Sequence, residues 1–241
     1  MENPMRLALL GAIWLALAPL EQDAMGSEAV EEGFVSIFNG RDLSGWEGDR
    51  AWWGVEEGAI TAQSTPDKPC TRATYLMWRD GRPGDFEMRL EYRLVGGNSG
   101  VQFRSREIPD WDTRGYQADI DAAGEWTGAL FEHARGGVAL RGERVAIGED
   151  GRRSVERFAD PAELLKHVDA EGWNSYRIVA MGEEISLFIN DRLMSQASDR
   201  QRDHAARRGV IALQMHPGPP MKIEFRNLRI RIDDAADATG R

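Results

Sequence analysis

The sequence predicts an all-β fold, a jelly-roll sandwich of two antiparallel sheets with one short helix. Two observations support this prediction: many short segments alternate apolar and polar residues, and turn signals separate these segments at even spacing. In "DFEMRLEYRL" (85–94), Phe86, Met88 and Leu90 share one face and charged residues occupy the other. That pattern is typical of an antiparallel strand with one face in the core.

The remaining elements follow from the same signals in chain order. "FVSIFNGRDLSGW" (34–46) is an apolar run that ends at a turn, and "WWGVEEGAITAQS" (52–64) contains two strands about Glu57-Gly58. Further strands are expected at 99–105, 115–121, 128–134, 136–142, 208–216 and 221–233, with three more within 173–198. The helix is expected over 160–168, because Asp160 suits an N-cap and Pro161 a first helical position.

The N-terminal segment, residues 1–29, is predicted to be a signal peptide and leader. Arg6 precedes an apolar run (7–20) that is too short to span a bilayer, as in secretory signals. We therefore expect an exported protein, periplasmic or secreted, with one domain over 33–234 and a tail at 235–241. No membrane span is expected after the signal, and Cys70, the only cysteine, allows no internal disulfide.

The net charge of the chain limits the kinds of partner that it can bind. Forty acidic and 30 basic residues give a net charge of −10, which argues against a nucleic-acid partner. The oligomeric state does not follow from the sequence.

One face of the strand "GYQADID" (115–121) carries Gln117, Asp119 and Asp121, whereas a strand that is merely wet is usually coated with Lys and Thr. Similar outward residues occur in two other strands, namely Gln102, Arg104, Gln214 and His216. If these strands share one curved sheet, their polar faces line a groove.

The segment "GALFEHA" (128–134) contains one more candidate residue for this groove, Glu132. Glu132 points outward only if Phe131 packs inward, and His133 then lies on the opposite side. Planar amides, carboxylates and guanidinium groups of this kind bind neighbouring sugar hydroxyls in pairs. Trp111 and Trp126 flank the strand 115–121, and each is a candidate platform for a sugar ring or simply a packed loop residue.

Five segments, in this order, resemble the 3-keto-disaccharide hydrolase domain family. They are "GFVSIFNGRDLSGW" (33–46), "GNSGVQFRS" (97–105), "GYQADID" with "TGALFEHARGG" (127–137), "WNSYRIVAMGEEISLFIND" (173–191) and "ALQMHPGPPMKIEFRNLRI" (212–230). The resemblance covers roughly 33–234. It implies a concanavalin A-like sandwich, export, and an enzyme that acts on 3-keto-glycosides.

A 3-keto sugar requires a base near C2, an electrophile at the 3-oxygen and an acid for the leaving oxygen. Asp119 or Glu132 is the expected base, and His216 is expected to act as base or acid. Arg104, with Gln117, is expected to stabilise the enolate oxygen. Substrate contacts are expected from Arg104, Gln117, Gln102, Asp121, Trp126, Gln214 and Arg141.

Several of these residues also suit a purely structural role. Asp119 and Glu132 also suit pairing with Arg104 or Arg141, His216 suits capping of the turn at 217–220, and Asp121 suits the turn that follows its strand. No cofactor is expected. A divalent metal at Asp119, Glu132 and His216 has only weak support, because no compact ligand spacing occurs.

Two other functions compete with the enzyme. A non-catalytic carbohydrate-binding module needs the hydrogen-bonding groups and an aromatic platform but no acid–base set. A retaining glucanase needs two carboxylates at a fixed spacing on one strand, and "YQADID" lacks that pattern.

Overall fold

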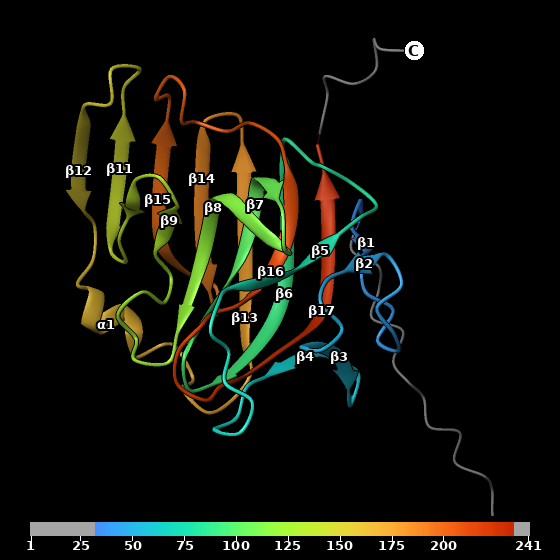
Figure 1. Cartoon of the computed structure of the whole chain (residues 1–241). Helices are drawn as coiled ribbons and strands as arrows, with labels where there is room; N and C mark the ends of the chain where they lie inside the picture. The colour runs from blue at the N-terminus through green and yellow to red at the C-terminus, as the bar shows by residue number, and fades with distance from the viewer. Residues whose placement is uncertain (1–31, 234–241) are drawn as a thin grey trace, which may run out of the picture. The chain divides into compact units, whose positions relative to one another are not determined.

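The computed structural model describes residues 32–233, which form two antiparallel sheets (Figure 1). The ten-stranded sheet has the order β12-β11-β15-β14-β13-β6-β17-β4-β3, with β1 paired to β17. Its strands are β1 (Val35–Ser36), β3 (Trp53–Glu56), β4 (Ala59–Gln63), β6 (Phe86–Val95), β11 (Glu143–Ile147), β12 (Arg153–Arg157), β13 (Asn174–Met181), β14 (Glu184–Ile189), β15 (Arg192–Asp199) and β17 (Lys222–Ile232). All pairings are antiparallel except β11 with β15.

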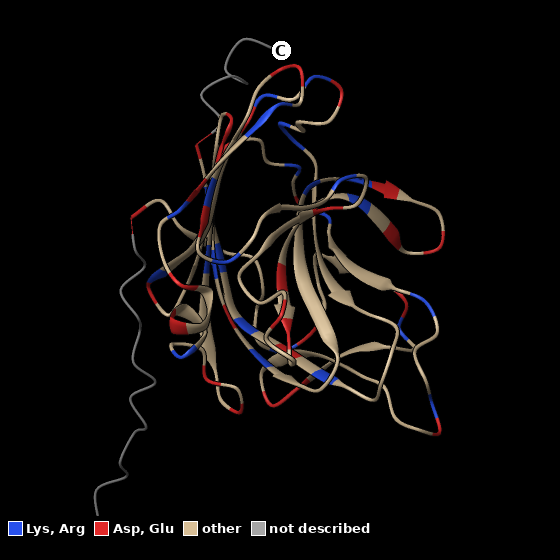
Figure 2. Ribbon diagram, turned by 90° about the vertical axis from the view of Figure 1, so that its left-hand side faces the viewer, with Lys and Arg blue, Asp and Glu red and all other residues tan. Residues whose placement is uncertain are grey.

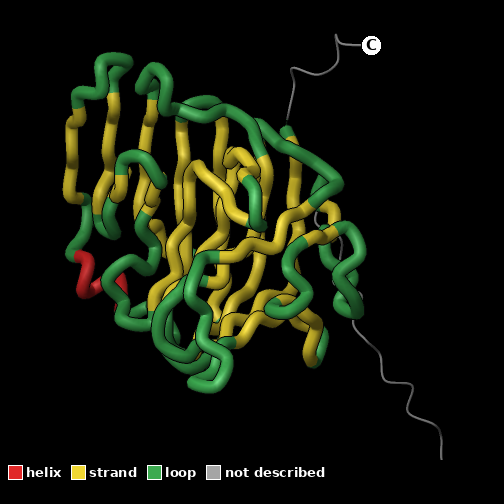
Figure 3. The backbone as a smooth tube through the Cα atoms, viewed as in Figure 1, coloured by secondary structure: helices red, strands yellow, loops and turns green. Residues whose placement is uncertain are grey.

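The seven-stranded sheet has the order β10-β9-β8-β7-β16-β5-β2. Its strands are β2 (Trp46–Glu47), β5 (Thr74–Trp78), β7 (Asn98–Ile108), β8 (Asp112–Asp121), β9 (Leu130–Glu132), β10 (Gly136–Ala139) and β16 (Val210–Met215). The predicted all-β, two-sheet fold is confirmed, and strands dominate Figure 3. The predicted signal peptide (1–29) and tail (235–241) lie outside the described residues.

The helix α1 (Pro161–Leu165) begins as predicted. The Asp160 carboxylate accepts hydrogen bonds from the amides of Ala162 and Glu163 at 2.7 and 3.2 Å, which satisfies two amides that lack helical partners. It ends at Leu165, earlier than the expected residue 168. No helix in residues 32–233 is long and apolar enough to cross a membrane.

The core lies between the two sheets, which appear as two layers in Figure 2. Phe86 of β6 meets Phe103 of β7 edge-on, with ring centroids 5.9 Å apart. Hydrogen bonds also cross the layers, since the Tyr176 hydroxyl donates to the carbonyl oxygen of Asp119 at 3.3 Å. These contacts fix the seven-stranded sheet on its partner and leave its other face for a site.

The charged face of β6 lies on the outer surface of the ten-stranded sheet. There Arg93 pairs with Glu224 at 2.7 Å and Arg226 with Glu91 at 2.7 Å, and Lys222 contacts Glu56 at 3.0 Å. Figure 2 shows the acidic and basic residues interleaved on this layer. This surface is therefore separate from the polar face of the seven-stranded sheet.

Candidate functional site

The polar face of the seven-stranded sheet is built by register. Strand pairing aligns one row across β5, β16, β7 and β8, made of Tyr75, Gln214, Gly100 and Asp119. The adjacent row is made of Met77, Ala212, Gln102, Gln117 and Phe131. Residues in register across a sheet point to the same side, so both rows form the floor of one groove.

Gln117 is the centre of this floor. Its Nε2 donates to Asp119 Oδ1 at 2.5 Å and to Gln214 Oε1 at 3.0 Å. Its Oε1 accepts a hydrogen bond from Gln102 Nε2 at 2.8 Å. Both amide protons and the oxygen thus have partners, which holds Gln117 in one orientation.

Gly100 makes room for that orientation. A Cβ on Gly100 would lie 2.7–2.8 Å from Cγ, Cδ and Nε2 of Gln117. Because real contacts at Cβ are longer, the Gln117 side chain can lie across β7 only where β7 carries a glycine.

Asp119 is the ionisable group of the floor. Its side chain is buried, with 4% of the residue exposed. Burial raises the pKa of Asp119 to about 7, the charge of Asp121 acts in the same direction, and the hydrogen bond from Gln117 opposes both. Among residues 32–233 only Gln117 bonds the carboxylate, through Oδ1, while Asp119 lines a pocket of about 530 Å³. A pocket carboxylate with a pKa near neutral suits a general base.

Tyr75 and His133 form one wall of this pocket, which we call the groove pocket. Gln214 Nε2 donates to the Tyr75 hydroxyl at 2.8 Å, and that hydroxyl lies 3.4 Å from His133 Nε2. His133 Nδ1 lies 3.2 Å from the carbonyl oxygen of Gly115. The Gln102 Nε2 donor lies further from Nδ1, at 3.4 Å. Because the nearer partner is a carbonyl, which only accepts, we assign the proton to Nδ1, and Nε2 then accepts from Tyr75. Burial lowers the pKa of His133 and raises that of Tyr75 to about 12, which favours the neutral form of each.

The rim of the groove pocket is aromatic on one side. Trp126 meets Phe131 edge-on at 5.9 Å, and Phe131 meets His133 edge-on at 5.6 Å. Trp126 therefore lies at the groove, as the sequence suggested. His216 also lines the pocket, although its Nδ1 donates to the Pro217 carbonyl oxygen at 2.6 Å. The pocket placement and the turn contact of His216 thus occur together.

The expectation that Glu132 lies on the groove is wrong. Strand pairing sets Glu132 opposite Tyr116, on the core side, and Phe131 opposite Gln117. Glu132 instead accepts a hydrogen bond from Arg135 Nε at 3.0 Å. Phe131 and His133 therefore face the groove, the reverse of what the sequence suggested.

The expectation that Arg104 lies on the groove is also wrong. A β-bulge shifts the register between Phe103 and Arg106, and Arg104 has a φ of 46°. A bulge redirects side chains, and the Arg104 guanidinium binds three groups away from the groove floor. These are the carbonyl oxygens of Gly84 (2.8 Å) and Gly182 (2.8 Å) and the Asp85 carboxylate (3.0 Å).

Arg141 and Asp121 have structural roles in place of the expected substrate contacts. Arg141 is buried and donates to the carbonyl oxygens of Pro161, Thr127 and Gly124. Asp121 accepts hydrogen bonds from three amides of the turn that follows, those of Ala123, Glu125 and Trp126. The turn alternative for Asp121 is therefore the observed arrangement, and both residues position the loop that carries Trp126.

Gln102 lies on the groove side of the sheet, as expected, but a substrate cannot reach its side chain. It is fully buried, its Oε1 accepts from Ser105 Oγ at 2.6 Å, and its Nε2 donates to Gln117. It supports the floor and does not line the pocket. Gln117 and Gln214 do line it, as expected.

Five polar residues that line the groove pocket were not predicted from the sequence, namely Tyr75, Asn98, Asp112, Arg114 and His133. Tyr75 lies in β5, whose five residues are all buried, so no alternation marks its face. The phenol itself was a usable signal, because a buried Tyr hydroxyl normally requires a polar partner.

Within residues 32–233, no three His, Cys, Asp or Glu side chains gather as a set of metal ligands. Asp119 and Glu132 lie on opposite faces, so the set of Asp119, Glu132 and His216 is not assembled.

The fold and the groove define the class first. The chain is a two-sheet, galectin-like sandwich with a polar groove on one sheet: it superposes with a TM-score of 0.52, at 10% identity, on a Bacillus subtilis protein described as having a galectin-like fold, covering 79% of this chain and 90% of that one. The chain belongs to the 3-keto-alpha-glucoside-1,2-lyase-like domain family, whose model matches residues 33–231. The resemblance found in the sequence is thereby confirmed.

Other relatives have names that indicate carbohydrate chemistry. A 3-keto-disaccharide hydrolase of Bacteroides thetaiotaomicron is 27% identical over 115 residues, 42% of this chain and 37% of that protein's length. A Parabacteroides distasonis protein named as a candidate glycosyl hydrolase has a TM-score of 0.57 at 19% identity, covering 83% and 98% of the two chains. A carbohydrate-binding module of B. subtilis has a TM-score of 0.50 at 18% identity, covering 77% and 94%. These structural similarities concern the fold.

Proposed function

We propose that this protein is an enzyme that binds a 3-keto-glycoside or 3-keto-disaccharide in the groove pocket and cleaves it, with hydrolysis as the net outcome. The observation that carries the proposal is Asp119, a buried carboxylate whose pKa is raised to about 7, in a pocket lined by groups that bind hydroxyls. Family membership supports the substrate class, and the hydrolase relative named above supports the outcome.

In the proposed reaction, Asp119 removes the proton from C2, which is acidic because the neighbouring C3 is a ketone. The electron pair moves into the C2–C3 bond and forms an enolate at the 3-oxygen. The enolate collapses, the C1–O bond breaks, and the leaving oxygen takes up a proton. Water then adds to the C1–C2 double bond of the enone and gives the free 3-keto sugar.

Two further residues have the right chemistry for the other steps. Arg114 is the only arginine among the residues that line the groove pocket, and its side chain is 42% exposed. We assign it to the enolate oxygen in place of Arg104, since a guanidinium stabilises developing negative charge. His216 lines the same pocket, and we assign it to the proton of the leaving oxygen.

The test is to incubate the purified protein with 3-keto-trehalose and follow the release of 3-keto-glucose. The Asp119→Asn variant should lose about 100-fold or more in kcat, the usual contribution of a general base. It should also stop the exchange of the C2 hydrogen with deuterium from the solvent. The matched control is Asp110→Asn, an exposed carboxylate paired with Arg72 at 3.4 Å, which should keep full activity.

A non-catalytic carbohydrate-binding module is the alternative, favoured by the amide-rich floor and by the fold shared with a B. subtilis binding module. If the protein is a binding module, the wild-type protein should bind ordinary glycans, release no 3-keto-glucose and catalyse no exchange of the C2 hydrogen. Such a result would remove the enzyme proposal.

A further inference from the structure

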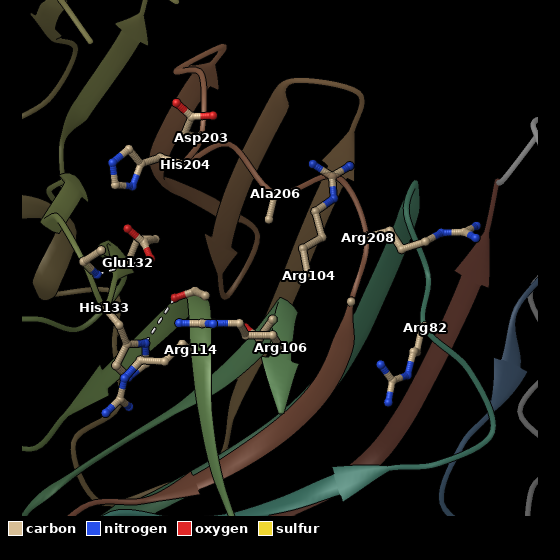
Figure 4. Close-up of a pocket in the computed structure, with 14 residues that line it drawn as sticks. Arg82, Arg104, Arg106, Arg114, Glu132, His133, Asp203, His204, Ala206 and Arg208 are labelled. Carbon is tan, nitrogen blue, oxygen red and sulfur yellow. Dashed lines mark hydrogen bonds between the residues drawn. The ribbon is translucent and has the colours of Figure 1, made fainter. Parts of the chain in front are cut away.

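A second pocket, of about 920 Å³, adjoins the groove pocket. Its lining contains five arginines: Arg82, Arg104, Arg106, Arg114 and Arg208. Arg114 and His133 line both pockets, so the two meet at these side chains. Figure 4 shows Arg106, Arg114 and His133 on one side of this arginine pocket and Arg82 and Arg208 on the other.

The charge of the arginine pocket is opposite to that of the chain. The whole sequence has a net charge of −10, whereas the only acidic residues in this lining are Glu132 and Asp203. Glu132 is already paired with Arg135, which lies outside the lining, at 3.0 Å. Three of the arginines also have carboxylate partners outside the lining: Arg104 with Asp85 at 3.0 Å, Arg82 with Glu107 at 3.9 Å and Arg114 with Asp112 at 3.1 Å. The lining itself still holds more arginines than acidic residues, and this excess of positive charge draws anions towards the pocket.

Arg106 and Arg114 form a pair of like charges in the wall of the arginine pocket. Strand pairing sets them directly opposite each other on β7 and β8, an arrangement in which like charges destabilise a sheet. Arg114 shares its charge with Asp112 at 3.1 Å. Arg106 is exposed and forms no ion pair with any residue in 32–233. An oxyanion bound beside Arg106 would offset this repulsion and leave Arg114 for the role assigned to it in the groove pocket.

The floor of the arginine pocket is closely packed backbone. The β-bulge at Arg104 turns the chain so that Ser105 is approached from two sides by glycines. A Cβ on Gly115 would lie 2.3 Å from Ser105 Oγ, and a Cβ on Gly209 would lie 2.3 Å from the Ser105 carbonyl oxygen. Arg104, through hydrogen bonds to Gly84, Gly182 and Asp85, holds the same floor in place. The arginines thus project from a fixed frame.

We propose that the arginine pocket is an anion subsite, which receives a carboxylate or sulfate group on the part of the substrate that extends past the ring held over Asp119. The inference rests on the proposed function for the position of that ring. It predicts a preference for acidic glycosides, in which a second sugar unit is a uronate or bears a sulfate ester.

The experiment measures binding and turnover separately. Calorimetry compares two ordinary disaccharides that differ only at C6 of the second unit, a hydroxymethyl in one and a carboxylate in the other. The acidic disaccharide should bind about tenfold more tightly at low salt, as one charge-assisted contact allows. The advantage should shrink at 0.5 M salt as the charges are screened, and inorganic sulfate should compete with the acidic disaccharide only.

The double variant Arg106→Gln with Arg208→Gln should reduce the preference to less than about twofold, because the neutral amides keep polar contacts but lose the charge. Its turnover of a neutral 3-keto-disaccharide should stay at the wild-type value, which also shows that it folds. The control Arg152→Gln removes an arginine that is 91% exposed and paired with Asp150, and it should keep the preference.

Equal affinity of the wild-type protein for the two disaccharides would overturn the subsite, as would a preference that survives in the double variant. Binding of inorganic sulfate without any gain for the acidic disaccharide would also overturn it. Failure of the protein to cleave the neutral 3-keto-disaccharide would refute the proposed function alone, since the anion preference is measured without turnover.

Discussion

Gln117 Nε2 donates a hydrogen bond to Asp119 Oδ1 at 2.5 Å, and the two residues are neighbours on one face of β8. The period of two along a strand brings the amide and the carboxylate together. The remaining contacts of Gln117, to Gln102 and Gln214, fix the direction of that hydrogen bond. Asp119 is therefore oriented by its own strand and its neighbours before any ligand arrives.

The activity should depend on pH through Asp119. Because the base must be ionised and the pKa of Asp119 is raised to about 7, kcat/KM on a 3-keto-glycoside should rise with pH and level off above about 7. A profile measured from pH 5 to 9 checks this. A constant rate between pH 5 and 8 would show that Asp119 is not the base.

Stability should depend on pH in the opposite direction. The pKa of Asp119 is higher in the folded state than its ordinary value of 3.8, so between these values the folded protein binds more protons than the unfolded chain. The free energy of unfolding should therefore fall by on the order of 3–4 kcal/mol from Asp119 as pH rises from about 4 to above 7. Urea titrations at several pH values, compared with Asp119→Asn, isolate this contribution. If the variant shows the same slope as the wild type, the carboxylate is ionised in the fold throughout.

Gly100→Ala should disrupt the floor of the groove. Its Cβ would lie 2.7 Å from Gln117 Cγ, so Gln117 must move and its hydrogen bond to Asp119 is lost. We expect a loss of about 1–3 kcal/mol in stability, as for other overpacked sites, and a fall in kcat/KM of about tenfold or more.

Gly54→Ala is the matched control for Gly100→Ala. Gly54 also lies in a strand, β3, and nothing lies within 4 Å of its Cβ position. Its stability should be unchanged or increase by up to about 1 kcal/mol. Equal behaviour of the two variants in denaturation and turnover would contradict the role given to Gly100.

The ion pair behind β9 should matter for stability. Asp199, fully buried, binds Arg135 Nη2 at 2.7 Å and accepts from the Tyr116 hydroxyl at 2.5 Å. Burial acts to raise the pKa of Asp199, but these hydrogen bonds hold it below its ordinary value. Asp199→Asn should cost about 3 kcal/mol because it leaves a buried guanidinium less well paired, and Tyr116→Phe about 1 kcal/mol.

The control for Asp199→Asn is Glu156→Gln, which removes an exposed ion pair between Glu156 and Arg144 at 3.0 Å. Its cost in urea denaturation should stay below about 1 kcal/mol. If Asp199→Asn costs no more than Glu156→Gln, the buried network does not stabilise β9.

His133 should be neutral and protonated on Nδ1 at pH 7. Its Nδ1 lies 3.2 Å from the Gly115 carbonyl oxygen, and burial lowers its pKa. Nitrogen-15 chemical shifts of the imidazole distinguish the two tautomers, and Tyr75→Phe should shift the Nε2 signal by removing its donor. A proton found on Nε2 would contradict the hydrogen-bond chain through Tyr75.

Alternation within a continuous strand determined the predictions that the structure reproduces. Gln117 and Asp119 share a face of β8, Gln214 lies on the matching face of β16, and Asp160 caps the N-terminus of the helix. These features depend on the period of a strand and on local capping, which neighbouring residues fix by themselves.

The tertiary structure decided the rest of the site. β9 has only three residues, so its side is set by pairing with β8 and not by its own pattern, which places His133 rather than Glu132 at the groove. The bulge in β7 shifts the register of the strand, so the Arg104 side chain points away from the groove floor. Pairing between distant strands also brought Tyr75 beside Gln214. A strand's sequence fixes which residues share a side, but register and bulges, which arise from contacts between distant segments, fix which side meets the ligand.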